Sequence, residues 1–136
     1  MPTWLLSRAN ARAQAIRVDA FAVAGSSGYL SRLLASLADE GAASQVELSR
    51  RTGIDPSDVV AAVNELASRR FVTRERDPHD ARRNVVALTR AGRAELARLD
   101  GVVAEIQERF LAPLNEAERR QLVRILTKLG GESDQR

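Results

Sequence analysis

A change of pattern at Phe71 constrains the fold of this chain more than any other feature. Before it, Asp55 can cap a helix and Pro56 suits the first helical position. Apolar residues then recur at helical spacing, at Val59, Val63, Leu66 and Ala67. The residues after it predict two strands and a connector rich in turn formers, at 71–76, 84–89 and 77–83 respectively. The segment therefore predicts a helix followed by a β-hairpin.

Positive charge is concentrated in this hairpin and its flanks. Residues 69–93 contain eight arginines and three acidic residues, whereas the whole chain of 136 residues has a net charge of only +3. The segment thus carries +5 and the remainder of the chain −2. Such a cluster is the electrostatic footprint of a protein that binds a polyanion. The alternative is an ordinary solvated surface rich in arginine.

Another short helix is predicted immediately before the helix that Asp55 caps. Ser44 and Glu47 have the spacing of a capping box, and Gly53 is a suitable C-terminal stop. The helix that Asp55 caps follows after three or four residues. Two short helices at this separation are typical of a helix-turn-helix.

Four further helices are predicted around this centre. Their ranges are 3–20, 28–40, 90–112 and 116–129, and residues 130–136 form a polar tail expected to fray. The helix at 28–40 has a core stripe of Leu30, Leu33, Leu34 and Leu37. In the last helix we expect Leu122, Ile125, Leu126 and Leu129 to face inward.

The helices at the two chain ends carry apolar seams that need a partner surface. The seam of helix 3–20 has alternating steps of three and four residues, the rhythm of helices that pack lengthwise. The seams could cover each other within one chain, but they also suit a two-fold interface, which we favour. The predicted dimer-interface residues are Leu6, Ala9, Ala13, Ile16, Leu122, Leu126 and Leu129.

Composition narrows the classes of function. Cysteine is absent, which excludes disulfides and thiolate metal sites, and we expect no metal and no cofactor. The one histidine, His79, lies in the predicted turn and no glycine-rich phosphate loop follows a strand, so we expect no enzyme. The sequence has no long apolar run and no signal-peptide core at Met1, which predicts a cytoplasmic protein without a membrane partner.

The segment from Arg74 to Arg93 resembles the wing signature of the MarR family of transcriptional regulators. In that signature an Asp-x-Arg element precedes a strand that ends in Leu-Thr-x-x-Gly. The matching residues here are Asp80, Arg82, Leu88, Thr89 and Gly92. The resemblance covers nearly the whole chain and implies one mainly α-helical domain, 1–136, with a winged helix-turn-helix at about 28–93. Residues 3–20 and 90–129 would then supply the dimerisation helices.

The resemblance implies a homodimer that binds double-stranded DNA. The helix at 56–68 would enter the major groove, and each hairpin would reach a neighbouring minor groove. The candidate DNA-binding residues are Ser44, Gln45, Ser57, Val60, Ala61, Asn64, Arg74, Arg82 and Arg83. Of these, Val60 and Ala61 could contact thymine methyl groups, and Asn64 could bond bases or phosphates.

The chain departs from the family pattern at several positions. Val60 and Ala61 stand where serine and arginine are frequent, which shifts the expected weight from direct base readout to phosphate and shape contacts. Arg70 stands where glycine is usual, so the helix must end without the residue that adopts a left-handed conformation easily. Arg82 either reaches the minor groove or pairs with Asp80 to stiffen the wing, in which case Arg83 is the better candidate for phosphate.

Two functions follow from these observations. The leading hypothesis is a sequence-specific, dimeric transcriptional repressor that a small-molecule ligand releases from DNA. The alternative is a winged-helix scaffold that binds an acidic protein partner. By resemblance, a small aromatic compound is a candidate ligand, and Trp4, Phe21 and Tyr29 either line its pocket or pack in the core.

Overall fold

The structure is a computed structural model that describes residues 1–131; residues 132–136 of the predicted tail lie outside the described part. Its elements are α1 (Pro2–Val23), α2 (Gly28–Glu40), α3 (Gln45–Thr52), α4 (Pro56–Ser68), β1 (Val72–Asp77), β2 (Asp80–Leu88), α5 (Arg90–Leu111) and α6 (Glu116–Leu129). All the predicted helices are present, although α1 continues beyond residue 20 to Val23. The predicted capping boxes of α3 and α6 are both confirmed.

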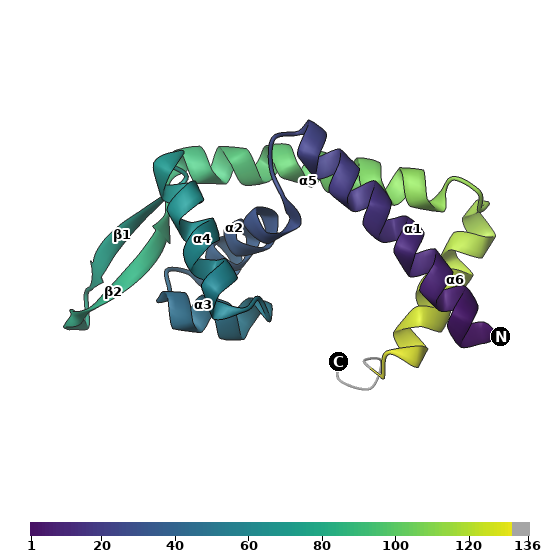
Figure 1. Cartoon of the computed structure of the whole chain (residues 1–136), viewed down its shortest axis with the longest axis horizontal. Coiled ribbons are helices and arrows are strands. Elements are labelled where there is room, and N and C mark those ends of the chain that lie inside the picture. The colour runs from purple at the N-terminus through teal and green to yellow at the C-terminus, as the bar shows by residue number, and fades with distance from the viewer. Residues whose placement is uncertain (132–136) are drawn as a thin grey trace.

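The long helix α5 connects two parts of the molecule (Figure 1). At one end α2, α3, α4 and the hairpin form a lobe, and at the other end lie α1 and α6. The α1 helix packs along α5, where Arg12 donates to the carbonyl oxygens of Phe110 and Arg109 at 2.8 and 3.0 Å. These carbonyls belong to the last turn of α5, where unpaired acceptors and the helix dipole favour a cation.

The hydrophobic core lies within the lobe and continues along α5. All four leucines of the predicted α2 stripe are buried, and they pack with Val59, Val63 and Leu66 of α4 and with Leu99 and Ile106 of α5. Burial of one such side chain contributes about 1.5–3 kcal/mol relative to full exposure. Ala62 is also buried, which the sequence did not predict, while Ala67 is only partly buried.

The end of α4 takes an unusual conformation. Arg70 has a φ of 64°, the only positive φ of a non-glycine residue within residues 1–131. Its N–H donates to the carbonyl of Ala67 at 3.0 Å, and the N–H of Phe71 donates to the carbonyl of Leu66 at 2.9 Å. These two bonds form a Schellman motif, in which the left-handed position usually carries glycine. The helix therefore ends in the left-handed conformation even though no glycine is present.

Gly92 allows α5 to start directly beside this turn. A Cβ atom at Gly92 would lie 2.1 Å from the carbonyl oxygen of Phe71 and 2.7 Å from Cδ1 of Leu88. The Oγ1 of Thr89 accepts from the Gly92 N–H at 3.0 Å and donates to the carbonyl of Arg70 at 2.8 Å. The Leu-Thr-x-x-Gly element thus joins the end of β2, the start of α5 and the end of α4.

The hairpin is longer than predicted. Its strands pair antiparallel from Val72 opposite Leu88 to Arg76 opposite Asn84, followed by an irregularity and the pair Asp77 and Asp80. The prediction of a connector at 77–83 was therefore wrong for most of its residues, since β2 begins at Asp80. Local bonds explain the difference, because Asp77 and Asp80 accept from backbone N–H groups two residues further on and tighten the turn.

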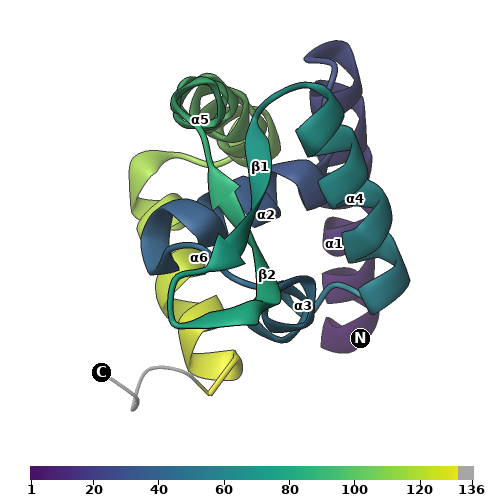
Figure 2. The same cartoon turned by 90° about the vertical axis from the view of Figure 1, so that its left-hand side faces the viewer.

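The apolar side of α6 is exposed, which corrects the expectation that it faces inward. Ile125 and Leu126 are 44% and 41% exposed and Leu129 is 72% exposed. Leu122 is partly buried, and no residue of α6 is fully buried. Figure 2 shows α6 and α1 on opposite sides of the molecule, so their seams do not cover each other within the described chain.

Candidate DNA-binding surface

The turn between α3 and α4 is fixed by side-chain hydrogen bonds. Gly53 adopts the left-handed conformation with φ 72°, and the Ser49 hydroxyl donates to the carbonyl of Ile54 at 2.6 Å. Asp55 caps α4 by accepting from the Ser57 N–H at 3.1 Å and from its hydroxyl at 2.5 Å. The hydrogen bond from the Ser57 hydroxyl is the main reason that the pKa of Asp55 lies below its ordinary value, and the bond from the Ser57 backbone N–H adds to the effect. A carboxylate is thus kept ionised at the positive end of the helix.

The outward face of α4 holds four of the predicted DNA-binding residues. Ser57, Val60, Ala61 and Asn64 are all exposed and follow helical spacing on the side opposite the core. Two of the polar groups already have partners, because Ser57 binds Asp55 and the Oδ1 of Asn64 accepts a hydrogen bond from Arg74. The structure thus brings together Asn64 and Arg74, which the sequence placed only in separate elements.

Ser44 and Gln45, the two predicted DNA-binding residues at the start of α3, differ in how accessible they are to DNA. The hydroxyl of Ser44 accepts from the Glu47 N–H at 3.2 Å, and Glu47 returns the bond by accepting from the Ser44 N–H at 2.9 Å. This oxygen therefore already serves the capping box. Gln45 is partly exposed and lies at the edge of a surface notch between α3 and α4.

The two wing arginines have different environments. The Arg82 side chain is 92% exposed, although its Nε lies 3.4 Å from Oδ1 of Asp80. The Arg83 side chain is 41% exposed, pairs with Glu47 of α3, and lies 3.5 Å from Asp77. Arg82 therefore projects from the hairpin while keeping one contact with Asp80, whereas Arg83 connects the hairpin to the helix-turn-helix.

The base of the hairpin is held by a contact that the sequence did not indicate. Ala43, just before α3, forms an isolated antiparallel bridge with Val86 of β2, with backbone N–O distances of 2.7 and 3.1 Å. Together with the Arg83–Glu47 pair, this bridge fixes the hairpin relative to α3. The capping-box pattern identified Glu47 only as a cap, and no signal in the sequence pointed to its second partner.

Several arginines of the helix-turn-helix and the hairpin are exposed. Arg50, Arg74, Arg76 and Arg82 are exposed, and His79 lies at the exposed turn of the hairpin. Figure 2 looks onto the hairpin and shows α4 to one side of it, and Figure 1 shows the tip of the hairpin projecting away from α3 and α4. This surface therefore combines an accessible helix face with a hairpin that projects positive charge, as a duplex with two grooves requires.

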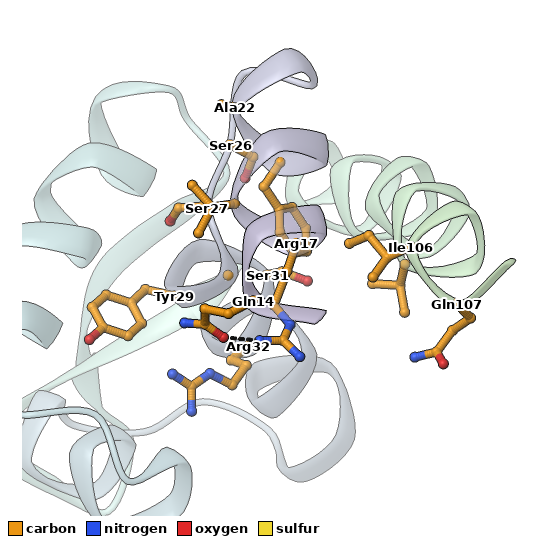
Figure 3. A pocket seen from close by; sticks show the side chains of 14 residues that line it. Gln14, Arg17, Ala22, Ser26, Ser27, Tyr29, Ser31, Arg32, Ile106 and Gln107 are labelled. Carbon is orange, nitrogen blue, oxygen red and sulfur yellow. Dashed lines mark hydrogen bonds between the residues drawn. The ribbon is translucent and has the colours of Figure 1, made fainter. Parts of the chain in front are cut away.

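A pocket of about 740 Å³ lies between α1, the start of α2 and α5. Its polar residues include Gln14, Arg17 and Arg32, and its apolar residues include Phe21 and Ile106 (Figure 3). Phe21 lines the pocket and is also buried in the core, so both predicted alternatives hold for it, whereas Tyr29 lines the pocket and is 43% exposed. Trp4, in the first turns of α1, is 57% exposed and is not part of the lining, so its prediction was wrong.

Two structural features of residues 1–131 concern metal binding and membrane insertion. No group of three or more histidine, cysteine or acidic residues there could hold a metal ion. Among the same residues, no helix is both long and apolar enough to cross a membrane.

Comparison with known proteins identifies the family. Residues 31–83 match the sequence model of the MarR family. The chain is 33% identical to the HTH-type transcriptional repressor NicR of Pseudomonas putida over 96 residues, which are 71% of this chain and 61% of NicR. The chain thus spans less than two thirds of that curated relative.

Solved structures match over almost the full chain. BpsR of Bordetella bronchiseptica, whose DNA binding is regulated by 6-hydroxynicotinic acid, is 30% identical with a TM-score of 0.78, covering 96% of this chain and 93% of that chain. MarR of E. coli in its apo form is 20% identical with a TM-score of 0.81, covering 93% and 95%, and supports the fold. The predicted winged helix-turn-helix is therefore confirmed, and the chain belongs to the MarR family.

Proposed function

We propose that this protein is a sequence-specific DNA-binding repressor that acts as a homodimer. The observation that carries the proposal is the exposed face of α4 beside a hairpin whose Arg82 side chain is 92% exposed. In this arrangement α4 enters the major groove and the hairpin reaches the minor groove, where the negative potential attracts an arginine. NicR, a relative, is a transcriptional repressor, and this favours regulation over a protein scaffold or an enzyme.

The two wing arginines lie in different environments, and we propose a different role for each. Arg82 is the proposed minor-groove residue, since its guanidinium is exposed and only its Nε is near Asp80. Arg83 is the proposed anchor of the wing, since it binds Glu47 and Asp77. The direct contribution of such half-exposed ion pairs to stability is small, about 1 kcal/mol or less, so the role of Arg83 is orientation.

The dimer follows from the uncovered apolar surfaces. Leu6 of α1 and Leu126 of α6 are 51% and 41% exposed, while Ala9 is exposed and Ala13 is partly exposed. Ile16 is partly buried against the core and contributes less free surface. A second copy of the chain would cover these seams, and two-fold symmetry would place two α4 helices on half-sites about one helical turn apart.

The pocket beside α1 is the proposed site of a small aromatic acid. Arg17 and Arg32 can bind a carboxylate, while Phe21, Ile106 and Tyr29 can enclose an aromatic ring. BpsR, a relative, responds to 6-hydroxynicotinic acid, which has this chemistry. A thermal-shift screen of hydroxylated aromatic acids should find a compound that raises the Tm, because binding to the native state stabilises it.

Selection from a random duplex library tests the main proposal. The full chain should enrich duplexes with an inverted repeat and bind them with an affinity that falls steeply with salt concentration. Mass measurement of the free protein and of the complex should give two subunits in each. Failure to enrich any duplex would refute DNA binding, and a monomeric mass in both states would refute the dimer.

A further inference from the structure

An apolar notch of about 280 Å³ lies between α3 and α4, on the face that the proposed function assigns to the major groove. It is lined by Gln45, Val46, Ser49, Arg50, Pro56 and Val60. Val46 is 75% exposed and Val60 is 42% exposed, although both belong to well-formed helices with buried opposite faces. We call this surface the valine notch.

The arrangement of the two valines argues against treating them as scattered exposed residues without a function. Single exposed apolar side chains are common on proteins and require no function. Here, however, two valines on separate helices line one depression, and Arg50 lines it as well. Arg74, hydrogen-bonded to Asn64, adds positive charge beside the same face of α4. Apolar surface framed by cations suits an occupant that is apolar in one part and anionic around it.

The major groove of DNA offers an occupant with this chemistry. Among the base edges exposed there, the thymine C5-methyl group is the apolar one, and phosphates flank it on both strands. We propose that the valine notch receives thymine methyl groups, so that Val46 and Val60 select thymine over cytosine in each half-site. This inference rests on the proposed DNA-binding function and names the base feature that the recognition surface reads.

Removal of the methyl group alone tests the inference. The probe is the duplex enriched by the wild-type chain, with each thymine of a half-site replaced in turn by uracil, which keeps every hydrogen-bonding group. At the thymine that faces the notch, uracil should raise Kd about four-fold in one half-site and about sixteen-fold in both. Replacement of cytosine by 5-methylcytosine at the same position should recover part of the affinity lost by a thymine-to-cytosine change.

A double-mutant cycle assigns the effect to the valines. With Val60→Ala, and separately with Val46→Thr, the difference between thymine and uracil should become smaller than for the wild type, because each variant removes part of the apolar lining of the notch. The control Val23→Ala, at a residue of α1 that is 84% exposed, should leave that difference unchanged. Far-UV circular dichroism checks that each variant is folded, and the uracil series on the wild-type chain needs no variant.

The outcomes separate this inference from the proposed function. If a duplex is enriched but contains no thymine in its half-sites, or if uracil is tolerated at every position, the inference is wrong and DNA binding stands. Persistence of the full uracil effect in both valine variants would also overturn it. If no duplex is enriched, the proposed DNA-binding function is itself wrong.

Discussion

Replacement of Arg70 by glycine should stabilise the fold. Arg70 is the left-handed residue of the Schellman motif that ends α4, with φ 64°. Its backbone is used fully, since its N–H binds Ala67 and its carbonyl accepts from Thr89. Its side chain is exposed, so glycine removes conformational strain with little loss of packing.

The size of the effect is the difference between two opposing terms. A left-handed conformation costs an L-residue about 1–2 kcal/mol, and glycine removes this cost. Glycine also increases the entropy of the unfolded chain, which lowers stability by about 0.4–1 kcal/mol. The net expectation is a gain of about 1 kcal/mol, or roughly 3–5 °C in Tm for a chain of this length.

Chemical and thermal unfolding at one fixed protein concentration measure this gain, since subunit association also shifts Tm. The matched control is Arg70→Ala, which removes the same side chain but keeps a Cβ in the left-handed region, and it should change stability little. Equal stability of Arg70→Gly and Arg70→Ala would refute the assignment of strain to this residue.

Three further predictions concern other parts of the structure. Gly92→Ala should destabilise the chain by roughly 1–3 kcal/mol, measured by urea unfolding, because its Cβ would lie 2.1 Å from a backbone oxygen; Gly101→Ala, at an α5 position with open space, should not destabilise it. The hydrogen bond from Arg98, and in addition its positive charge, lower the pKa of Glu95 below its ordinary value of 4.5. The ion pair therefore stabilises the fold above pH 4.5, and this stabilisation is lost as the pH falls through the lowered pKa of Glu95. Glu95→Gln should therefore be less stable near pH 7 and lose less stability on acidification than the wild type, with identical pH profiles as the contrary result. Leu126→Asp, on the exposed side of α6, should shift the mass measured by light scattering from two subunits to one, whereas an unchanged dimer would exclude this surface from the interface.

Local patterns in the sequence predicted most of the elements. The Ser44–Glu47 and Asn115–Glu118 capping boxes, the leucine stripe of α2 and the Asp55 cap all depend on residues within one or two helical turns. Such signals are readable without tertiary structure, because their partners are a fixed number of residues apart.

Most of the differences from the prediction arose where contacts between distant residues add to the local bonds. Local turn bonds start β2 at Asp80, and the distant Arg83–Glu47 pair then supports residues that lack strong strand preference. The left-handed conformation of Arg70 was not predicted, because it depends on the Thr89 hydroxyl and the close approach of Gly92, which fix the junction around it. The apolar side of α6 was assigned inward from its periodicity alone, and periodicity identifies an apolar face without identifying what covers it.

The candidate site was predicted only as a set of residue positions. The order of residues on α4 indicated its outward face, but the bond between Asn64 and Arg74 and the partners of Arg83 depend on how the hairpin lies against the helices. The sequence left the roles of Arg82 and Arg83 open. Their contrasting exposure, 92% against 41%, now supports Arg82 as the residue that reaches DNA.

The salt dependence of duplex binding by the wild type and by Arg82→Ala tests whether the exposed wing arginine contacts DNA. Fluorescence anisotropy with the selected duplex should show that log K falls linearly with log salt concentration for the wild type. Arg82→Ala should bind more weakly and flatten the slope by about two, one for each subunit of the dimer. Equal affinity and equal slope for the two proteins would show that Arg82 does not contact DNA, and an absence of salt-dependent binding by the wild type would show that the protein does not bind DNA in this way.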